Sequence, residues 1–255
     1  VLFRSTAAGA PGPLKSAVLE AVSAALASID MRRHRGQHPR MGAVDVIPFI
    51  PLRGVEMTEV VAFSREVARE TADAFHLPVF LYEKSAAHPE RENLAAIRRG
   101  QFEGMAEKLK DPAWRPDFGP PDMHPTAGVT AVGARMPLVA FNVNLGTGNR
   151  AVADRIARRV RHAGGGLRFC KAIGVALGDR GIVQVSMNMT DYTRTALYQA
   201  VELIRIEARR FGVSVVGSEI VGLVPMAALI ETAAFYLGLE DFDPRQVLET
   251  RFLEE

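Results

Sequence analysis

The stretch "LRFCKAIGVALGDRGIVQVSMNMTD" (residues 167–191) decides the fold. Two strand-like runs flank the turn "GDRG" (178–181), and this pattern predicts a β-hairpin. A strand-like run and a helical run precede the hairpin (137–163), and a helical run and a strand-like run follow it (192–224). The resulting order, strand–helix–hairpin–helix–strand, is the ferredoxin-like pattern. We therefore predict an α+β fold for the second half of the chain.

The first half of the chain repeats part of this pattern. Residues 43–86 read strand, turn, long helix and short strand, in the same order as residues 182–224. Two prolines in "AVDVIPFIPL" predict an edge strand, and Thr58 is the expected N-cap of the long helix. We predict two ferredoxin-like α/β-sandwich subdomains, residues 1–132 and 133–255, the first without its opening strand and helix.

Helix boundaries are indicated by prolines and glycines. A helix is predicted over 13–29 with Pro13 in its first turn, and another over 225–237 that ends before Gly238. Residues 91–110 predict two short helices that are separated at Gly100. Residues 111–135 are rich in proline and glycine, so we expect a mostly irregular segment, ordered by its tryptophan, phenylalanine and methionines.

Composition excludes several classes of protein. The chain has 255 residues, 48% of them hydrophobic, and 31 Lys+Arg against 29 Asp+Glu give a net charge of +2. No basic block is interleaved with aromatic residues, so we expect no nucleic-acid partner; "RIARRVRH" (155–162) is predicted to be a solvated helix face. No apolar run is long enough to cross a membrane. A single cysteine, Cys170, predicts a reducing, cytoplasmic location and a small buried hydrophobe.

The chain begins at Val1 without a methionine. Its first residues, "VLFRS", are also what a common sequencing adapter gives when it is translated. We therefore hypothesise an incomplete gene fragment, which a longer read of the same locus would check.

Two patterns suggest cofactors, and both have a better structural interpretation. "GTGNRA" (146–151) mimics a dinucleotide-binding loop, but no acidic residue follows at the spacing that a ribose contact requires. A helix start capped by Asn149 is the better prediction. His34 and His38 have the spacing of a helical zinc pair, but the glycine and proline around His38 disfavour a helix and no third ligand stands at motif spacing. We predict no metal site. His76, His88 and His162 are expected to be structural or surface residues.

His38 nevertheless has a functional interpretation. It lies in a loop with glycine and proline ahead of a strand, between Arg35 and Arg40. Nearby positive charge stabilises a neutral imidazole and attracts an anionic substrate. A loop histidine that is hydrogen-bonded to the backbone is the competing interpretation.

Several ordered motifs resemble one known family. "IDMRRHRGQHPRMGAVDVIPFIPLRGV" closely resembles the core motif of the glutamate formimidoyltransferases, and so do "WRPDFGP", "HPTAGVTAVGAR", "LVAFNVNL", "VQVSMNMTD" and "GLVPMAAL". The resemblance runs from about Gly9 to the C-terminus. It implies two α+β subdomains with a folate tunnel between them, a homodimer, and transfer of a formimino group from N-formimino-L-glutamate to N5 of tetrahydrofolate in histidine degradation. Tetrahydrofolate would be the co-substrate, without a metal.

The resemblance also assigns residues. It makes His38 the catalytic histidine, because His38 immediately precedes Pro-Arg-Met-Gly. It implies two stretches that contact folate. The first comprises Gly119, Pro120, Pro121, Asp122, Met123, His124, Pro125, Thr126, Ala127 and Gly128. The second comprises Gly165, Gly166, Leu167, Arg168, Phe169, Cys170, Lys171, Ala172, Ile173 and Gly174.

The implied chemistry suits an imidazole. One group must take a proton from the attacking folate amine and return one to the departing glutamate nitrogen, and a pKa near ~6.5 permits both. Such acid–base catalysis is worth about 10²–10⁴-fold. We hypothesise that Arg40, Arg53 and Arg168 bind the glutamate carboxylates of the two substrates, and that Asp45 orients His38.

Three interpretations stay open. The first is an active formimidoyltransferase. The second is a folate-binding remnant without catalysis, since about forty residues with the family's opening strand and "PNFSEG"-like loop are absent from this sequence. The third is transfer of a formyl group between folate and glutamate. The cyclodeaminase domain of the animal enzymes is also absent, so its reaction is not expected.

Overall fold

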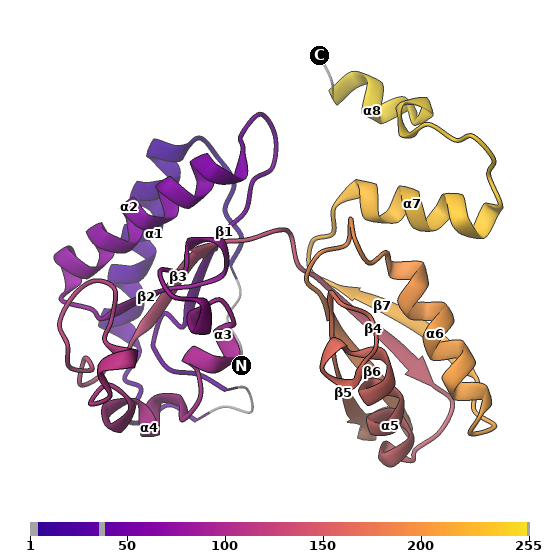
Figure 1. Ribbon diagram of the computed structural model, residues 1–255, viewed down its shortest axis with the longest axis horizontal. Coiled ribbons are helices and arrows are strands. Elements are labelled where there is room, and N and C mark those ends of the chain that lie inside the picture. Colours follow the sequence, from indigo (N-terminus) through magenta and orange to yellow (C-terminus); the bar gives the residue numbers. More distant parts are fainter. Residues whose placement is uncertain (1–4, 36–38, 254–255) are drawn as a thin grey trace. The chain divides into compact units, whose positions relative to one another are not determined.

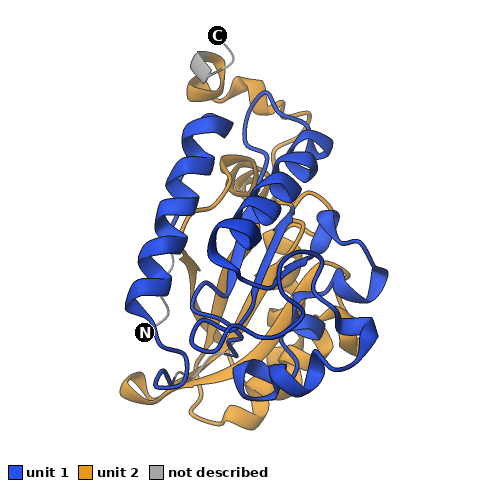
Figure 2. Ribbon diagram, turned by 90° about the vertical axis from the view of Figure 1, so that its left-hand side faces the viewer, with its two compact units in different colours: residues 1–135 blue, residues 136–255 orange. Residues whose placement is uncertain are grey.

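The computed structural model describes residues 5–35 and 39–253 (Figure 1). The chain divides into two compact units, Val1–Arg135 and Met136–Glu255 (Figure 2). Each unit contains a sheet and helices, which confirms the prediction of a mixed α/β fold with two sheet-containing subdomains. Among the described residues, no helix has the length and apolar content that crossing a membrane requires.

The second unit has the predicted ferredoxin-like topology. Its four strands pair in the order β5-β6-β4-β7, and every pair is antiparallel. Helices α5 and α6 pack against one face of the sheet, where alternate apolar residues of the strands form the core. The elements are β4 (Val139–Leu145), α5 (Arg150–Val160), β5 (Cys170–Leu177), β6 (Ile182–Met189), α6 (Leu197–Arg209) and β7 (Val215–Val221).

Several predicted ends in this unit are confirmed. The Asn149 side chain accepts a hydrogen bond from the Ala151 N–H at 3.1 Å, so it caps α5 as expected. Helix α7 (Met226–Leu237) follows Pro225 and ends at Gly238, whose φ is +64°. The arginines of 155–159 are exposed on α5, as predicted for a solvated helix face.

A short helix, α8 (Leu248–Leu253), follows α7 near the end of the described chain.

The first unit has a three-stranded sheet in the order β1-β3-β2, with both pairs parallel. The prediction of a ferredoxin-like, antiparallel sheet is therefore wrong for the described residues of this unit. The central strand β3 returns after a long connection, and such a connection lets it run in the same direction as its neighbours. The elements are α1 (Pro11–Ser28), β1 (Val46–Phe49), α2 (Met57–Phe75), β2 (Val79–Leu81), α3 (Leu94–Ile97), α4 (Gln101–Lys108) and β3 (Thr130–Ala134).

The predicted internal repeat is visible in the topology. In the first unit, β1 and β2 are joined through α2 and flank β3; in the second unit, β6 and β7 are joined through α6 and flank β4. The two crossovers match, and only the direction of the central strand differs. The proline-bearing strand β1 lies at the sheet edge, as predicted.

Two expectations for the first unit were wrong. Residues 130–134 were expected to be irregular, but they form β3, which is buried on both faces. Its sequence, "TAVGA", has neither alternation nor strong β-propensity, so only burial between two strands reveals it. Helix α2 is capped by Glu56 rather than Thr58, because the Glu59 carboxylate accepts a hydrogen bond from the Glu56 backbone N–H at 2.8 Å.

The remaining connections contain short turns of 3₁₀ helix. Gly100, with φ +91°, separates α3 from α4 as predicted. In the irregular segment, Trp114, Phe118 and Met123 pack against the hydrophobic clusters of the first unit, as expected of an ordered loop. The 3₁₀ turns span Glu83–Ser85, Pro89–Arg91, Pro112–Trp114, His162–Gly164, Gly178–Arg180 and Pro244–Gln246.

Candidate functional site

The expected catalytic histidine, His38, lies outside the described residues, together with Gly36 and Gln37. The chain on both sides of it is described. The site is therefore built from residues 30–35, from residues 39–45 and from the segments that these two stretches contact.

Backbone hydrogen bonds bring two distant motifs together. The carbonyl of buried Met41 accepts a hydrogen bond from the Val129 N–H at 3.1 Å, and the Ala43 N–H donates to the Ala127 carbonyl at 2.8 Å. The Met31 N–H donates to the Thr126 carbonyl at 2.8 Å. The segments before and after residues 36–38 are thus both fixed to the "HPTAG" motif.

Glycines make this approach possible. A Cβ atom at residue 42 would lie 2.1 Å from the Val129 carbonyl oxygen, and one at Gly128 would lie 2.1 Å from the Met41 carbonyl oxygen. Gly128 also has φ +75°, a conformation that favours glycine. The glycines of "RMG" and "TAG" are therefore required by close backbone contact.

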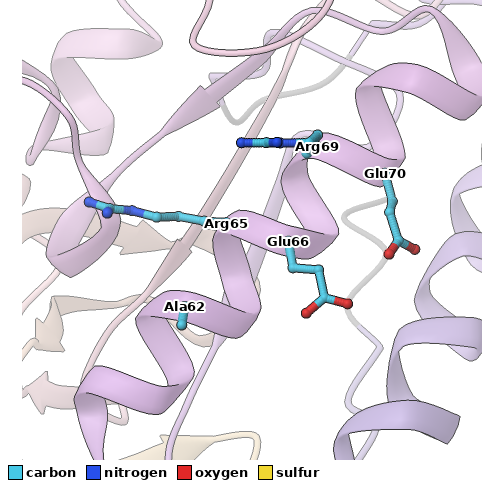
Figure 3. Close-up of a pocket in the computed structure, with 5 residues that line it drawn as sticks. All are labelled: Ala62, Arg65, Glu66, Arg69 and Glu70. Carbon is cyan, nitrogen blue, oxygen red and sulfur yellow. The ribbon is translucent and has the colours of Figure 1, made fainter.

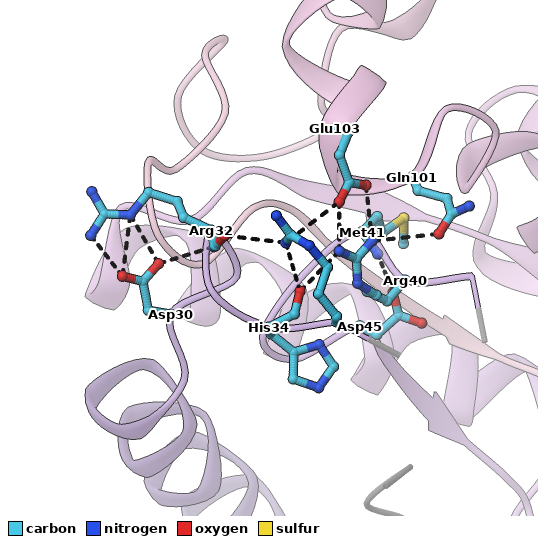
Figure 4. A network of polar contacts seen from close by, with 9 residues as sticks. Asp30, Arg32, His34, Arg40, Met41, Asp45, Gln101 and Glu103 are labelled. Atoms are coloured by element: carbon cyan, nitrogen blue, oxygen red, sulfur yellow. Dashed lines mark hydrogen bonds and ion pairs between the residues drawn. The ribbon is translucent and has the colours of Figure 1, made fainter. Parts of the chain in front are cut away.

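Arg40 is held inside its own unit (Figure 4). Its guanidinium donates to Glu103 at 2.9 and 2.6 Å and to the His34 carbonyl at 3.1 Å. Hydrogen bonding from Arg40 lowers the pKa of Glu103 to about 2, and the same pairing raises the pKa of Arg40. The Arg40 side chain is thus already paired with a carboxylate of the chain itself, which weakens the case for it as a substrate clamp.

Asp45 also has partners within the unit. One carboxylate oxygen accepts a hydrogen bond from the Met41 N–H at 2.7 Å, and the other pairs with Arg98. Asp45 therefore closes the loop after His38. That it also orients His38 stays a prediction.

The His34 ring has a buried nitrogen, Nδ1, without a hydrogen-bond partner among the described residues. Its backbone carbonyl, by contrast, accepts from both Arg35 at 3.0 Å and Arg40 at 3.1 Å. A buried orphan polar atom costs free energy unless a ligand or water satisfies it. His34 is therefore a candidate ligand contact.

The first predicted folate stretch forms a tight turn. His124 and Gly128 exchange two backbone hydrogen bonds at 3.1 and 2.9 Å. The His124 Nδ1 accepts from the N–H groups of Thr126 and Ala127 at 3.3 and 3.0 Å, so a neutral ring carries its proton on Nε2. The exposed members of the stretch are Gly119, Pro121, Asp122 and Pro125.

The second predicted stretch alternates between two faces of a sheet. Cys170, Ala172 and Gly174 are buried on the side of α5, and a Cβ at Gly174 would lie 2.6 Å from the Asp154 backbone nitrogen. Burial raises the pKa of the Cys170 thiol to about 12. Lys171 and Ile173 point to the other face, where Ile173 is 57% exposed. Within the part of the stretch that lies in β5, only Lys171 and Ile173 can offer side chains to a ligand.

Sequence reasoning missed a group of polar residues on that same face. The register aligns Asn142 with Ser186 and Glu219, and Asn144 with Gln184. The alternation in "FNVNL" and "VQVSMNM" is the signal that could have found them, because every second residue of a strand shares a face.

Other predicted histidines have the expected positions. His76 ends α2 with φ +49°, His88 is exposed in a loop, and His162 is exposed after α5. Within the described part of the chain, no three His, Cys, Asp or Glu side chains are grouped as metal ligands.

A groove along α2 is not a good ligand site (Figure 3). Its charged residues have partners in the chain. Glu66 and Glu70 each pair with Lys15 at 2.7 Å, Arg65 donates to the Ser85 carbonyl at 3.2 Å, and Arg69 lies over the Phe118 ring.

Comparison with known proteins defines the family. Residues 3–135 match the formiminotransferase domain, N-terminal subdomain, and residues 140–248 match the formiminotransferase domain. The chain belongs to the formiminotransferase family.

Its relatives include two proteins named glutamate formimidoyltransferase. A glutamate formimidoyltransferase of Streptococcus pyogenes is 53% identical over 97% of this chain and 83% of its own length. Another from Thermoplasma acidophilum is 45% identical over 92% of this chain and 78% of its own length. The formimidoyltransferase-cyclodeaminase of Rattus norvegicus is 44% identical, and the match covers 92% of this chain and 44% of that protein.

Proposed function

We propose that this protein is a glutamate formimidoyltransferase, which moves a formimino group from N-formimino-L-glutamate to N5 of tetrahydrofolate. The structural observation that supports this most directly is the pairing of residues 41–43 with residues 127–129 through the Met41–Val129 and Ala43–Ala127 backbone hydrogen bonds. The described residues that follow residue 38 thus pair with a stretch that the resemblance assigns to folate binding, which supports the proposal. Relatives that carry this name are 53% and 45% identical to the chain.

In the proposed mechanism, N5 of tetrahydrofolate attacks the formimino carbon and a tetrahedral centre forms. His38 takes the proton from N5 as the new C–N bond forms. It then gives a proton to the glutamate nitrogen as the old C–N bond breaks, so the proton count balances and the imidazole returns to its neutral state. Holding both substrates in register supplies the rest of the acceleration.

The surroundings of residue 38 support this role. The carbonyl of His34 is held by Arg40, and Met41 is held by Asp45 and Val129. These anchors fix the described chain on both sides of residues 36–38. Arg40 is therefore proposed to position the loop through Glu103.

Arg53 and Arg168 remain the proposed carboxylate clamps. Both side chains are exposed, and Arg168 lies 5.6 Å from the centre of the Phe169 ring, within the second folate stretch. A guanidinium binds carboxylates through two parallel hydrogen bonds. Both substrates carry glutamate carboxylates, so each arginine is expected to affect the Michaelis constant of one substrate.

Further properties follow the family. We propose domains with the boundary near residues 132–136, a folate tunnel, a homodimer, a cytoplasmic location and a place in histidine degradation. Tetrahydrofolate is the proposed co-substrate, and no metal is proposed.

The test is turnover of N-formimino-L-glutamate with tetrahydrofolate by the protein and by its His38→Ala variant. His88→Ala is the matched control, because His88 is exposed in a loop. The proposal expects activity that His38→Ala lowers by at least about 10²-fold and that His88→Ala leaves unchanged. Consumption of N-formyl-L-glutamate instead would select the formyl reaction. Saturable folate binding without turnover of either donor would select the non-catalytic remnant.

A further inference from the structure

The face of the second sheet that points away from α5 and α6 carries an ordered polar group. The Gln184 amide nitrogen donates to Asn144 Oδ1 at 2.8 Å and to Glu219 Oε1 at 2.7 Å. Gln184 and Asn144 are each 5% exposed, whereas Glu219 is exposed. We call Asn144, Gln184 and Glu219 the amide–carboxylate array. The three residues come from β4, β6 and β7, so the sheet itself fixes their spacing.

The array presents both hydrogen-bond acceptors and one donor group, the Asn144 amide nitrogen. Gln184 uses its two N–H groups inside the array, and its carbonyl oxygen is an acceptor only. The Glu219 carboxylate has two acceptor oxygens, one of which Gln184 orients. A hydrogen-bonded network of this kind holds its members in place before a ligand arrives. The chemistry presented is therefore a fixed carboxylate beside the Gln184 amide oxygen, with the Asn144 amide nitrogen as a donor on the side of Gly217.

Space lies next to the array. Gly217 is paired with Asn144 across β7 and β4. A Cβ atom at residue 217 would meet only Asn144 Nδ2, at 3.9 Å. No close contact explains this glycine, and its φ is not in the left-handed region. The missing side chain leaves an opening beside the Asn144 amide.

We infer that the array binds a planar N–C–N group that carries hydrogen on both nitrogens. This inference rests on the proposed function, because both proposed substrates contain such a group. N-formimino-L-glutamate has it in its formamidine, and tetrahydrofolate has it in the 2-amino and N3–H edge of its pterin ring. A carboxylate pairs with two parallel N–H donors through strong, charge-assisted hydrogen bonds.

The same array discriminates against ligands that lack the second N–H. A formyl group presents an oxygen where the formimino group presents an N–H, and this oxygen cannot donate a hydrogen bond to the Glu219 carboxylate. A site that hydrogen-bonds an N–H binds an analogue that lacks it more weakly. The array thus gives a physical basis for preferring a formimino donor.

Two variants test the inference and differ in how they act. Glu219→Gln keeps the size of the side chain but removes the negative charge and one acceptor. Gly217→Ala adds a methyl group to the opening, and the 3.9 Å approach to Asn144 shows that the sheet accommodates it. Glu240→Gln is the matched control, because Glu240 is an exposed carboxylate outside the array. Circular dichroism and urea unfolding check that each variant folds.

Binding is measured by titration calorimetry with two matched pairs of ligands. The first pair is N-formimino-L-glutamate and N-formyl-L-glutamate; the second is tetrahydrofolate and an analogue without the 2-amino group. Glu219→Gln is expected to weaken the N–C–N member of one pair about tenfold and to leave its analogue within twofold. Gly217→Ala is expected to weaken the same member. The pair that responds identifies which substrate the array holds.

Two results would overturn the inference: unchanged affinity for all four ligands in both variants, or no binding of either N–C–N ligand by the unmodified protein. Turnover by the unmodified protein is measured in parallel. If the unmodified protein turns over substrate but the variants bind all ligands unchanged, the array is not a binding site and the proposed function stands. If the variants bind more weakly but the unmodified protein shows no turnover, the array is a binding site and the proposed function is wrong.

Discussion

Asp45 and Met41 close the loop that follows His38. The Met41 backbone N–H donates to the Asp45 carboxylate at 2.7 Å, and Arg98 pairs with the second carboxylate oxygen. The carbonyl of the same methionine accepts from Val129. One carboxylate therefore connects the loop to α3 and, through Met41, to the "HPTAG" motif.

Asp45→Ala is expected to cost about 2 kcal/mol of the free energy of unfolding, because a partly buried N–H and Arg98 both lose their partner. Asp45→Asn keeps an acceptor for Met41, so about half of the loss should return. Urea unfolding measures both values. Turnover separates this role from an orienting one: if Asp45 contacts His38, the acidic limb of the pH–rate profile shifts in Asp45→Asn. An unchanged acidic limb would reject the orienting role.

Gly128→Ala is expected to destabilise the protein by at least about 3 kcal/mol. A left-handed backbone costs a non-glycine residue about 1–2 kcal/mol, and the new Cβ would also lie 2.1 Å from the Met41 carbonyl oxygen. Gly54 is the matched control, because its φ is +63° with open space around it. Gly54→Ala should therefore cost about 1–2 kcal/mol. Equal losses in the two variants, measured by urea unfolding, would contradict the role of close packing.

The Arg40–Glu103 pair predicts a dependence of stability on pH. The pKa of Glu103 is lowered in the folded protein to about 2, so the pair stabilises the fold above the unfolded pKa and the stabilisation is lost as the pH falls from about 4.5 to 2. The Glu103 side chain is 55% exposed, so solvent screening limits the contribution to about 1 kcal/mol or less.

Glu103→Gln should therefore lower the free energy of unfolding at pH 7. Near pH 2–3 the free energies of unfolding of the variant and the unmodified protein should become equal. Glu107→Gln changes an exposed ion pair on the same helix and serves as the control. A difference that persists unchanged at pH 2 would show that charge is not the cause.

The second predicted folate stretch should respond to substitution according to the face of β5 on which each residue lies. Lys171→Gln is expected to raise the Michaelis constant for tetrahydrofolate about 3- to 10-fold, because it removes a positive charge from the face opposite the core. Cys170→Ala should leave that constant unchanged and instead lower stability by about 1 kcal/mol, because the thiol is packed against α5. Steady-state kinetics and urea unfolding of both variants test the split. An equal change in the Michaelis constant for both would reject it.

The Cys170 thiol should also be slow to react. Its pKa, raised to about 12 by burial, leaves almost no thiolate at pH 8. Labelling with iodoacetamide is therefore expected to be slow in the native protein and complete in urea. Fast native labelling would show that this part of β5 opens readily.

Local signals in the sequence were sufficient for much of the second unit. The hairpin around "GDRG", the cap at Asn149 and the end of α7 at Gly238 depend on turn and cap chemistry within a few residues. The edge position of β1 followed from its prolines. The N-cap of α2 was misplaced because a glutamate that reaches back to Glu56 competes with the threonine that propensity favours.

Long-range packing decided what the sequence left open. Strand β3 owes its conformation to burial between β1 and β2, and its parallel direction to a long connection. The sequence of the second predicted folate stretch does not show which of its residues are buried. In β5, the sheet places Cys170 on the core face and Lys171 on the opposite face.

The sequence alone determined the family, the order of helices and strands in the second unit, and His38 as the candidate catalyst, because motifs and caps are local patterns. The tertiary structure alone decided which segments meet. It joined Met41 to Val129 and Gln184 to Glu219. Residues far apart in the chain become neighbours only when strands pair and glycines such as Gly128 allow two backbones to approach.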